Sequence, residues 1–373
     1  MKLIADTRRL VKLNTEGSYL ITVYINTRWA DEKQRERVKI FFRNELKKMV
    51  ENMEKADHTL EDDLDKIQTH IKGLIKQEYD EMYNGIALFL SSPLGVSMTI
   101  RSRAPFENQF AVAQEPKVRQ LARLMDEYAH ALLVMIDTDS ARIFDISLGG
   151  FTNEEDIQHD VHGRHAQGGW SQMRYQRHRQ AQQDRHQRDV AEYLTKVFDA
   201  EHPDHLILSG QEPTVASFQD FLPVRLQSRI IDIVKLDMKE GRDKIIETAI
   251  NCLQKHERAD EDESVDKLIE TAEAGGAAVI TADEVAQMVI AGKASRLMIH
   301  RKFSEQGWRC RSCGAIGHKI PLGCTICGAT VEASDLGEDL VREVIRRDGE
   351  VESVAENNKL ANKGGVGAFL RYR

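Results

Sequence analysis

ALLVMIDTDSARIFDIS (131–147) joins a run of apolar residues to a second β-prone segment through a short polar turn. The run over 131–138 has the length and composition of a buried strand, and 141–147 follows closely enough to be its hairpin partner. Further strands are predicted at 205–210 and 230–237, with helices between them. Strands that alternate with helices are typical of an α/β fold, here with mixed or mostly parallel sheets flanked by helices.

The flanking sequence extends this α/β pattern in both directions. At 373 residues the chain exceeds one ordinary domain. The acidic stretch ERADEDES (257–264) is a candidate boundary, and beyond it short β-rich segments alternate with helices again. We therefore predict an N-terminal α/β domain over 1–125, a central domain over 126–260, and a C-terminal α/β domain over 261–373.

The composition favours a globular protein of a reducing compartment. Hydrophobic residues make up 41% of the chain and charged residues 30%. No run of about eighteen apolar residues occurs, so we expect no membrane span, and the first residues lack the apolar core of a secretion signal. The five cysteines, four of them clustered, do not form a disulfide framework. We expect a cytoplasmic monomer.

The charge of the chain is unevenly distributed. The formal net charge of −8 argues against a nucleic-acid partner for the whole surface. RHAQGGWSQMRYQRHRQAQQDRHQR (164–188), however, carries six arginines and three histidines against one aspartate. The local balance decides where a polyanion docks, so this segment is a candidate RNA-binding surface.

A cysteine-rich insertion, WRCRSCGAIGHKIPLGCTICGAT (308–330), contains two Cys-x-x-Cys-Gly pairs with ten residues between them. Four thiolates in a tetrahedral array suit Zn²⁺ and leave no position for substrate water, so we predict a structural zinc ribbon with Cys310, Cys313, Cys324 and Cys327 as ligands. An iron–sulfur cluster or two redox-active pairs are the alternatives. Cys252 stands alone in an apolar helical pattern, which predicts a buried structural cysteine.

The basic segment contains a predicted helix start. Ser171 is a good N-cap residue, which places Trp170 and Tyr175 at the positions of a hydrophobic staple. Gln172 then becomes the first helical residue, beside unpaired backbone N–H groups that can stabilise an anion or a developing oxyanion. A capped helix with a solvated outer face is the simpler interpretation.

Basic side chains recur at near-helical spacing behind this start. One face is predicted to carry Arg174, Arg177, Arg185 and Arg188. Arginines on such a stripe suit phosphate contacts, and the two aromatic residues could stack on bases. The histidines nearby are expected at the surface: His162, His165, His178 and His186.

These residues resemble a known family. GGWSQMRYQRHR (168–179), followed by a long helix that ends near 190–194, is similar to the central domain of the archaeal and eukaryotic class-1 release factors and Pelota. The loop resembles most the Gly-x-x-Gln of the Vms-type release factors and of bacterial and archaeal relatives. GGVGAFLRYR (364–373) resembles the closing strand of their third domain, which carries a zinc ribbon in some members. The resemblance covers most of the chain and implies a three-domain architecture.

The resemblance implies a site that acts on peptidyl-tRNA. Gly168, Gly169 and Gln172 would form the catalytic loop, which enters the peptidyl-transferase centre beside the CCA end of P-site tRNA. The glutamine would help to place the attacking water, although it stands two residues later than in Gly-Gly-Gln. Ribosomal or transfer RNA would contact the residues Arg164, Trp170, Arg174, Tyr175, Arg177, Arg185 and Arg188.

The first domain, in the decoding-site-like position, lacks the Asn-Ile-Lys-Ser motif of stop-codon readers. Ribosome rescue with peptidyl-tRNA hydrolysis is therefore favoured over codon-specific termination. The alternative is a non-catalytic, Balon-like hibernation factor that occupies the ribosome without releasing peptide. In either case the expected partners are ribosomal RNA and P-site or A-site tRNA. A transfer-RNA nuclease and a small-molecule enzyme rank lower, because the sequence shows neither an acid–base set nor a phosphate-binding loop. The family's third domain often contacts a translational GTPase, which is therefore a candidate partner.

Overall fold

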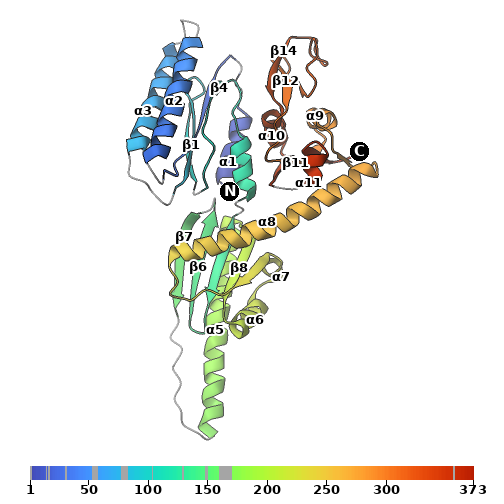
Figure 1. Ribbon diagram of the computed structural model, residues 1–373. Coiled ribbons are helices and arrows are strands. Elements are labelled where there is room, and N and C mark those ends of the chain that lie inside the picture. The colour runs from blue at the N-terminus through green and yellow to red at the C-terminus, as the bar shows by residue number, and fades with distance from the viewer. Residues whose placement is uncertain are drawn as a thin grey trace. The chain divides into compact units, whose positions relative to one another are not determined.

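The chain folds as two compact units (Figure 1). A computed structural model describes residues 2–373 apart from 14, 16, 30–31, 53–57, 77–82, 103, 128–129, 148–149, 159–169 and 356–357. Residues 127–257 form a central unit, while 2–126 and 258–373 together form a second, composite unit. The predicted first and third domains thus lie in one compact unit, and the division at 125 and 260 stays a prediction.

The central unit is built on a mixed sheet with the order β7-β6-β5-β8-β9. Its strands are β5 (Ala131–Ile136), β6 (Ser140–Ser147), β7 (Gly150–Gln158), β8 (His205–Gly210) and β9 (Ile230–Val234). The predicted hairpin is confirmed, because β5 and β6 are antiparallel partners. β8 runs parallel to β5, and β9 runs parallel to β8. The sheet is therefore mixed, in agreement with the prediction, because the short turn after β5 permits only antiparallel pairing on that side.

Helices cover both faces of the central sheet. Alternate residues of β5 point to opposite faces, so Leu132 and Val134 pack in one core and Leu133 packs in the other. The first core includes residues of α5 (Trp170–Glu201) and α6 (Glu212–Phe221), which a short helix, α7 (Val224–Gln227), follows. The second core includes residues from the first half of α8 (Arg242–Glu273).

The N-terminal part of the composite unit is a wholly antiparallel sheet in the order β3-β2-β1-β4. Its strands are β1 (Leu20–Asn26), β2 (Gly85–Ser91), β3 (Val96–Ser102) and β4 (Gln109–Ala113). Two helices, α2 (Glu32–Asn52) and α3 (His58–Lys76), lie side by side on one face and share its core (Figure 1). The α/β character expected for this part of the chain is confirmed.

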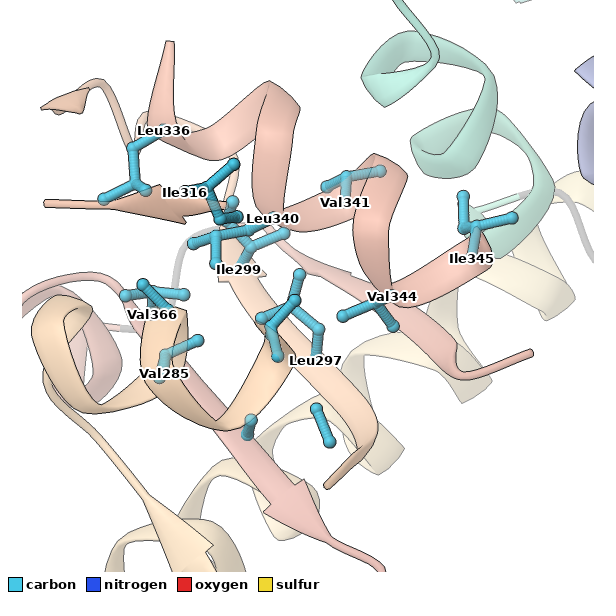
Figure 2. Close-up of a cluster of buried hydrophobic side chains, with 14 of the residues drawn as sticks. Val285, Leu297, Ile299, Ile316, Leu336, Leu340, Val341, Val344, Ile345 and Val366 are labelled. Carbon is cyan, nitrogen blue, oxygen red and sulfur yellow. The ribbon is translucent and has the colours of Figure 1, made fainter. Parts of the chain in front are cut away.

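The C-terminal part contains a second mixed sheet in the order β10-β16-β11-β15. Its strands are β10 (Ala278–Val279), β11 (Ala294–His300), β15 (Glu350–Val354) and β16 (Val366–Leu370). Figure 2 shows aliphatic side chains of α9 (Ala282–Ile290), α10 (Leu336–Arg346) and this sheet converging in one core. A short helix, α11 (Asn358–Asn362), precedes β16.

Two helices that precede the central unit in the sequence complete the C-terminal core. Val11 of α1 (Lys2–Val11) and both Val118 and Ala122, at the start of α4 (Arg119–Glu127), are buried in the same cluster as Val344 and Leu297. The acidic stretch at 257–264 was expected to separate domains. The stretch is helical and lies inside α8, whose apolar residues Val265 and Leu268 are buried in the composite unit. The boundary between the two units, at residues 257 and 258, therefore falls within a continuous helix.

Candidate functional site

The predicted basic helix exists as α5, a single helix of 32 residues. Its backbone is helical from Trp170 onward, so Ser171 is an interior residue and not the N-cap. Gln172 consequently occupies the third helical position, still within the first turn, where backbone N–H groups lack intrahelical acceptors.

Part of the predicted site lies outside the described residues. This applies to the loop residues Gly168 and Gly169 and to Arg164. For four further predicted residues the backbone is described as helical but the side chains are not: Trp170, Gln172, Arg174 and Tyr175. The structure therefore places the start of the helix, while the side-chain arrangement of the loop stays a prediction.

The second half of α5 fixes the helix to the sheet. Val190 and Leu194 are buried in the core, and the amide oxygen of Gln187 accepts a hydrogen bond of 2.8 Å from the hydroxyl of Ser217 on α6. His186, expected at the surface, is fully buried because it lies on this inward face. The anchoring contacts therefore begin at about residue 186.

The first half of α5 projects beyond the sheet (Figure 1). Fifteen residues separate Trp170 from Arg185, which corresponds to about 22 Å of helix. Arg177, Arg185 and Arg188 are exposed, as the predicted stripe requires. The guanidinium of Arg188 lies 5.6 Å from the centre of the Phe221 ring, so this arginine is oriented by α6.

The four clustered cysteines form a candidate metal centre in a small antiparallel sheet. β12 (Gln306–Cys310) lies between β13 (Ile316–Gly317) and β14 (Val331–Asp335). The sulfur atoms of Cys310, Cys313, Cys324 and Cys327 all lie within 4.8 Å of one another. Four thiolates around one Zn²⁺ with bonds of about 2.3 Å would have similar separations, so the donor set fits a tetrahedral metal ion.

Both Cys-x-x-Cys-Gly pairs adopt the same knuckle. The N–H of Gly314 donates to the carbonyl of Cys310 at 3.0 Å, and the N–H of Gly328 donates to the carbonyl of Cys324 at 2.9 Å. Each glycine has a positive φ, +72° and +76°, which disfavours other residues. The positive φ explains why a glycine follows the second cysteine of each pair.

The knuckles also bias the thiols toward binding a cation. The backbone N–H of Cys313 lowers the pKa of Cys310, and that of Cys327 lowers the pKa of Cys324 to about 6. The N–H of Ala315 lowers the pKa of Cys313, but burial and the neighbouring sulfur atoms outweigh it and raise this pKa to about 12. The lowered pKa of Cys310 and Cys324 favours the thiolate form, which is the form that binds a cation.

Cys252 differs from the other four cysteines. It lies on α8 and is buried in a core of the central unit, where burial, followed by the nearby charge of Asp232, raises its pKa to about 11. A thiol with a raised pKa is a poor nucleophile, which supports the predicted structural role.

Comparisons with known proteins place these features in a family context. Residues 116–254 match the model of bacterial archaeo-eukaryotic release factor family 10. The chain is therefore similar to the archaeo-eukaryotic release factors. The segment matched by the model contains β5 to β9, the basic helix α5 and the loop before it.

Curated relatives match a longer part of the chain at low identity. The chain is 23% identical over 353 residues to peptide chain release factor subunit 1 of Thermococcus kodakarensis, covering 83% of each chain. It is also 23% identical over 287 residues to the same factor of Thermococcus onnurineus, covering 69% of this chain and 68% of the relative. Among solved structures, ribosome-bound archaeal Pelota aligns with 99% of this chain and 94% of its own, at 14% identity and a TM-score of 0.43. No helix in the described part of this release-factor-like chain is long and apolar enough to cross a membrane.

Proposed function

We propose that this protein acts on the ribosome in the cytoplasm, where it hydrolyses the ester bond of peptidyl-tRNA to rescue stalled ribosomes. Gly168 and Gly169 would let the loop approach the CCA end closely, and Gln172 would help to place the attacking water. The reaction adds water across the ester and yields free peptide and deacylated tRNA. The missing Asn-Ile-Lys-Ser motif favours rescue over codon-specific termination.

The observation that carries the proposal is the first half of α5. It extends about 22 Å beyond its anchored part, ends at the Gly-Gly-Trp-Ser-Gln segment, and exposes arginines along its length. The positive end of the helix and its unpaired N–H groups would stabilise the developing oxyanion, and the arginines would pair with RNA phosphates. This chemistry matches the peptide chain release that the names of the curated relatives describe.

We also propose that the cysteine cluster holds one structural Zn²⁺. The donor set is closed, so it offers no position for substrate water. A translational GTPase is the proposed delivery partner, because the third domain of the family often serves that contact. The residues that would hold the metal are Cys310, Cys313, Cys324 and Cys327.

The test of hydrolysis is release of labelled peptide from stalled ribosomes or isolated large subunits. The variant Gln172→Ala should lose release by about a hundredfold or more, the scale seen when one oxyanion donor is removed. The matched control is Gln180→Ala, which removes an exposed glutamine of the same helix whose amide binds Asp184. The control should release peptide at the wild-type rate. Full activity of Gln172→Ala would refute the assigned role.

The binding part of the proposal has a separate readout. Arg177→Gln and Arg185→Gln should each weaken ribosome binding and lower the salt dependence by about one unit of log–log slope, because each removes one phosphate contact. Lys244→Gln, which removes an exposed lysine paired with Glu247 elsewhere in the central unit, is the control. Tight, salt-sensitive binding without any peptide release would instead identify a non-catalytic ribosome-binding factor.

A further inference from the structure

A buried ion-pair network joins the metal centre to the segment that leads into the central unit. The carboxylate of Glu115 accepts hydrogen bonds from Arg309 through one oxygen and from Arg346 through the other. The Nε of Arg342 lies 3.5 Å from the second oxygen. The side chains of Glu115, Arg309 and Arg342 are only 17%, 13% and 1% exposed. Arg309 directly precedes the metal-ligand candidate Cys310 in β12.

The residues that follow Glu115 are held by the same C-terminal elements. The buried carboxylate of Glu338, on α10, accepts the backbone N–H groups of Val118 and Arg119 and so caps the start of α4. The guanidinium of Arg119 donates to the carbonyl of Phe303 at 2.8 Å.

The other end of α4 is held as well. The carboxylate of Asp126 accepts the N–H of Ser353 on β15 at 2.5 Å. The central unit begins at the next residue, Glu127. The docked segment therefore runs from residue 115 up to the boundary of the unit that carries the basic helix.

The cysteine-rich sheet has little core of its own. Besides two cysteines, its buried cluster consists of Trp308 and Ala315, with Ala329 and Val331 packed against it. A sheet of this size cannot offset its loss of conformational entropy by apolar burial alone. Small thiolate-bound modules of this kind fold only when metal binding supplies the free energy.

We propose that metal bound by the four cysteines controls the docking of residues 115–127, with the Arg309–Glu115 pair as the connection. When the metal is lost, β12 loses its fixed position and Arg309 leaves Glu115. One carboxylate oxygen of a largely buried glutamate then loses its charged partner, which is costly in a low-dielectric site. The segment 115–127 then loosens from α10. The metal centre thus influences, through α4, the residues that lead into the central unit at Glu127.

Hydrogen–deuterium exchange on the full-length protein, with its metal and after chelation, tests this coupling. Loss of metal should accelerate exchange in 306–335 and also in 116–127, in the latter by about tenfold, the scale of one hydrogen bond to a charged group. Segment 205–222 of the central unit should be unchanged and serves as the internal reference. Metal content is measured in parallel by elemental analysis.

Two variants separate the connection from general damage. In Glu115→Gln, which keeps the four cysteines, the metal content should be that of the wild type, but 116–127 should exchange fast even with metal and respond little to chelation. The control Glu332→Gln removes an exposed acid that pairs with Arg311 in the same small sheet. It should retain both the protection of 116–127 and its response to metal.

Three outcomes overturn the inference. In the first, chelation accelerates hydrogen exchange in 306–335 while 116–127 stays protected. In the second, all segments, including 205–222, lose their protection from exchange together. In the third, Glu115→Gln behaves like the Glu332→Gln control. The inference rests on the proposed metal site and not on the proposed hydrolysis. A metal-free protein in elemental analysis would refute both the metal site and this coupling, whatever the peptide-release assay shows.

Discussion

Replacing Glu352 by glutamine should stabilise the composite unit above neutral pH and leave its stability unchanged in acid. Glu352 lies on β15 with a side chain that is 10% exposed, and its carboxylate is 3.2 Å from the guanidinium of Arg296 on β11. Burial raises the pKa of Glu352, Arg296 lowers it, and the acidic groups of Glu261, Asp260 and Glu350 raise it further. The net result is a rise from the ordinary value of 4.5 to about 7.

The sign of the effect follows from proton binding. Between pH 4.5 and pH 7 the folded chain holds a proton on Glu352 that the unfolded chain has lost. The stabilising contribution of this proton is therefore fully present below pH 4.5, falls as the pH rises through this window, and is absent above it. At about 1.36 kcal/mol per pKa unit, the loss amounts to about 3 kcal/mol. Glutamine resembles the protonated acid at every pH, so the variant escapes this loss.

Urea denaturation of the wild type and of Glu352→Gln at pH 4.5 and pH 8 measures the difference. Tryptophan fluorescence is a suitable signal, because Trp29 and Trp308 are both buried in the composite unit. The variant should match the wild type at the lower pH and exceed its free energy of unfolding by about 3 kcal/mol at the higher pH. Glu350→Gln, an exposed acid on the same strand, should change stability far less. A difference that is equal at the two pH values would refute the reasoning.

Three further outcomes follow from other sites. Asp63→Ala should destabilise the N-terminal sheet by about 2 kcal/mol more at pH 7 than near pH 2 in denaturation. Burial raises the pKa of Asp63, but hydrogen bonds to the carboxylate, including one from the N–H of Ser92, outweigh burial and lower this pKa to about 2. Equal losses at both pH values would contradict this. Gly317→Ala should impair metal retention in elemental analysis, since its Cβ would lie 2.5 Å from the indole nitrogen of Trp308; unchanged retention would show that the sheet adapts. Cys313→Ser should abolish stoichiometric metal binding, and a variant that still binds one equivalent would exclude the four-cysteine site.

Local sequence signals predicted the elements that rest on local chemistry. The apolar run at 131–136 forms a buried strand and pairs with the next segment as a hairpin, because turn residues and side-chain periodicity act over a few positions. The two cysteine knuckles were predictable for the same reason. Each is complete within six residues, and its glycine is required by a positive φ.

Pairing between distant segments was not predictable in this way. Neither β4 nor the antiparallel pairing of the first sheet has a distinctive local sequence pattern. Which strands pair depends on how their side chains pack against distant parts of the chain. Ser171 was predicted as a cap from residue preference alone, yet the helix continues through it. His186 was expected at the surface from the charge of its neighbours, but the helix turns this one position toward the sheet.

The sequence by itself determined the α/β class, the basic helix with its glycine-containing start, the metal-ligand spacing and the likeness to release factors. These depend on residues close together in the chain, for which identity and spacing are sufficient. Only the tertiary structure decided that the first and last segments share a compact unit, and that Glu115 meets Arg309 from 194 positions away. Buried charges must find partners wherever the fold brings them, and no local rule says which ones will meet.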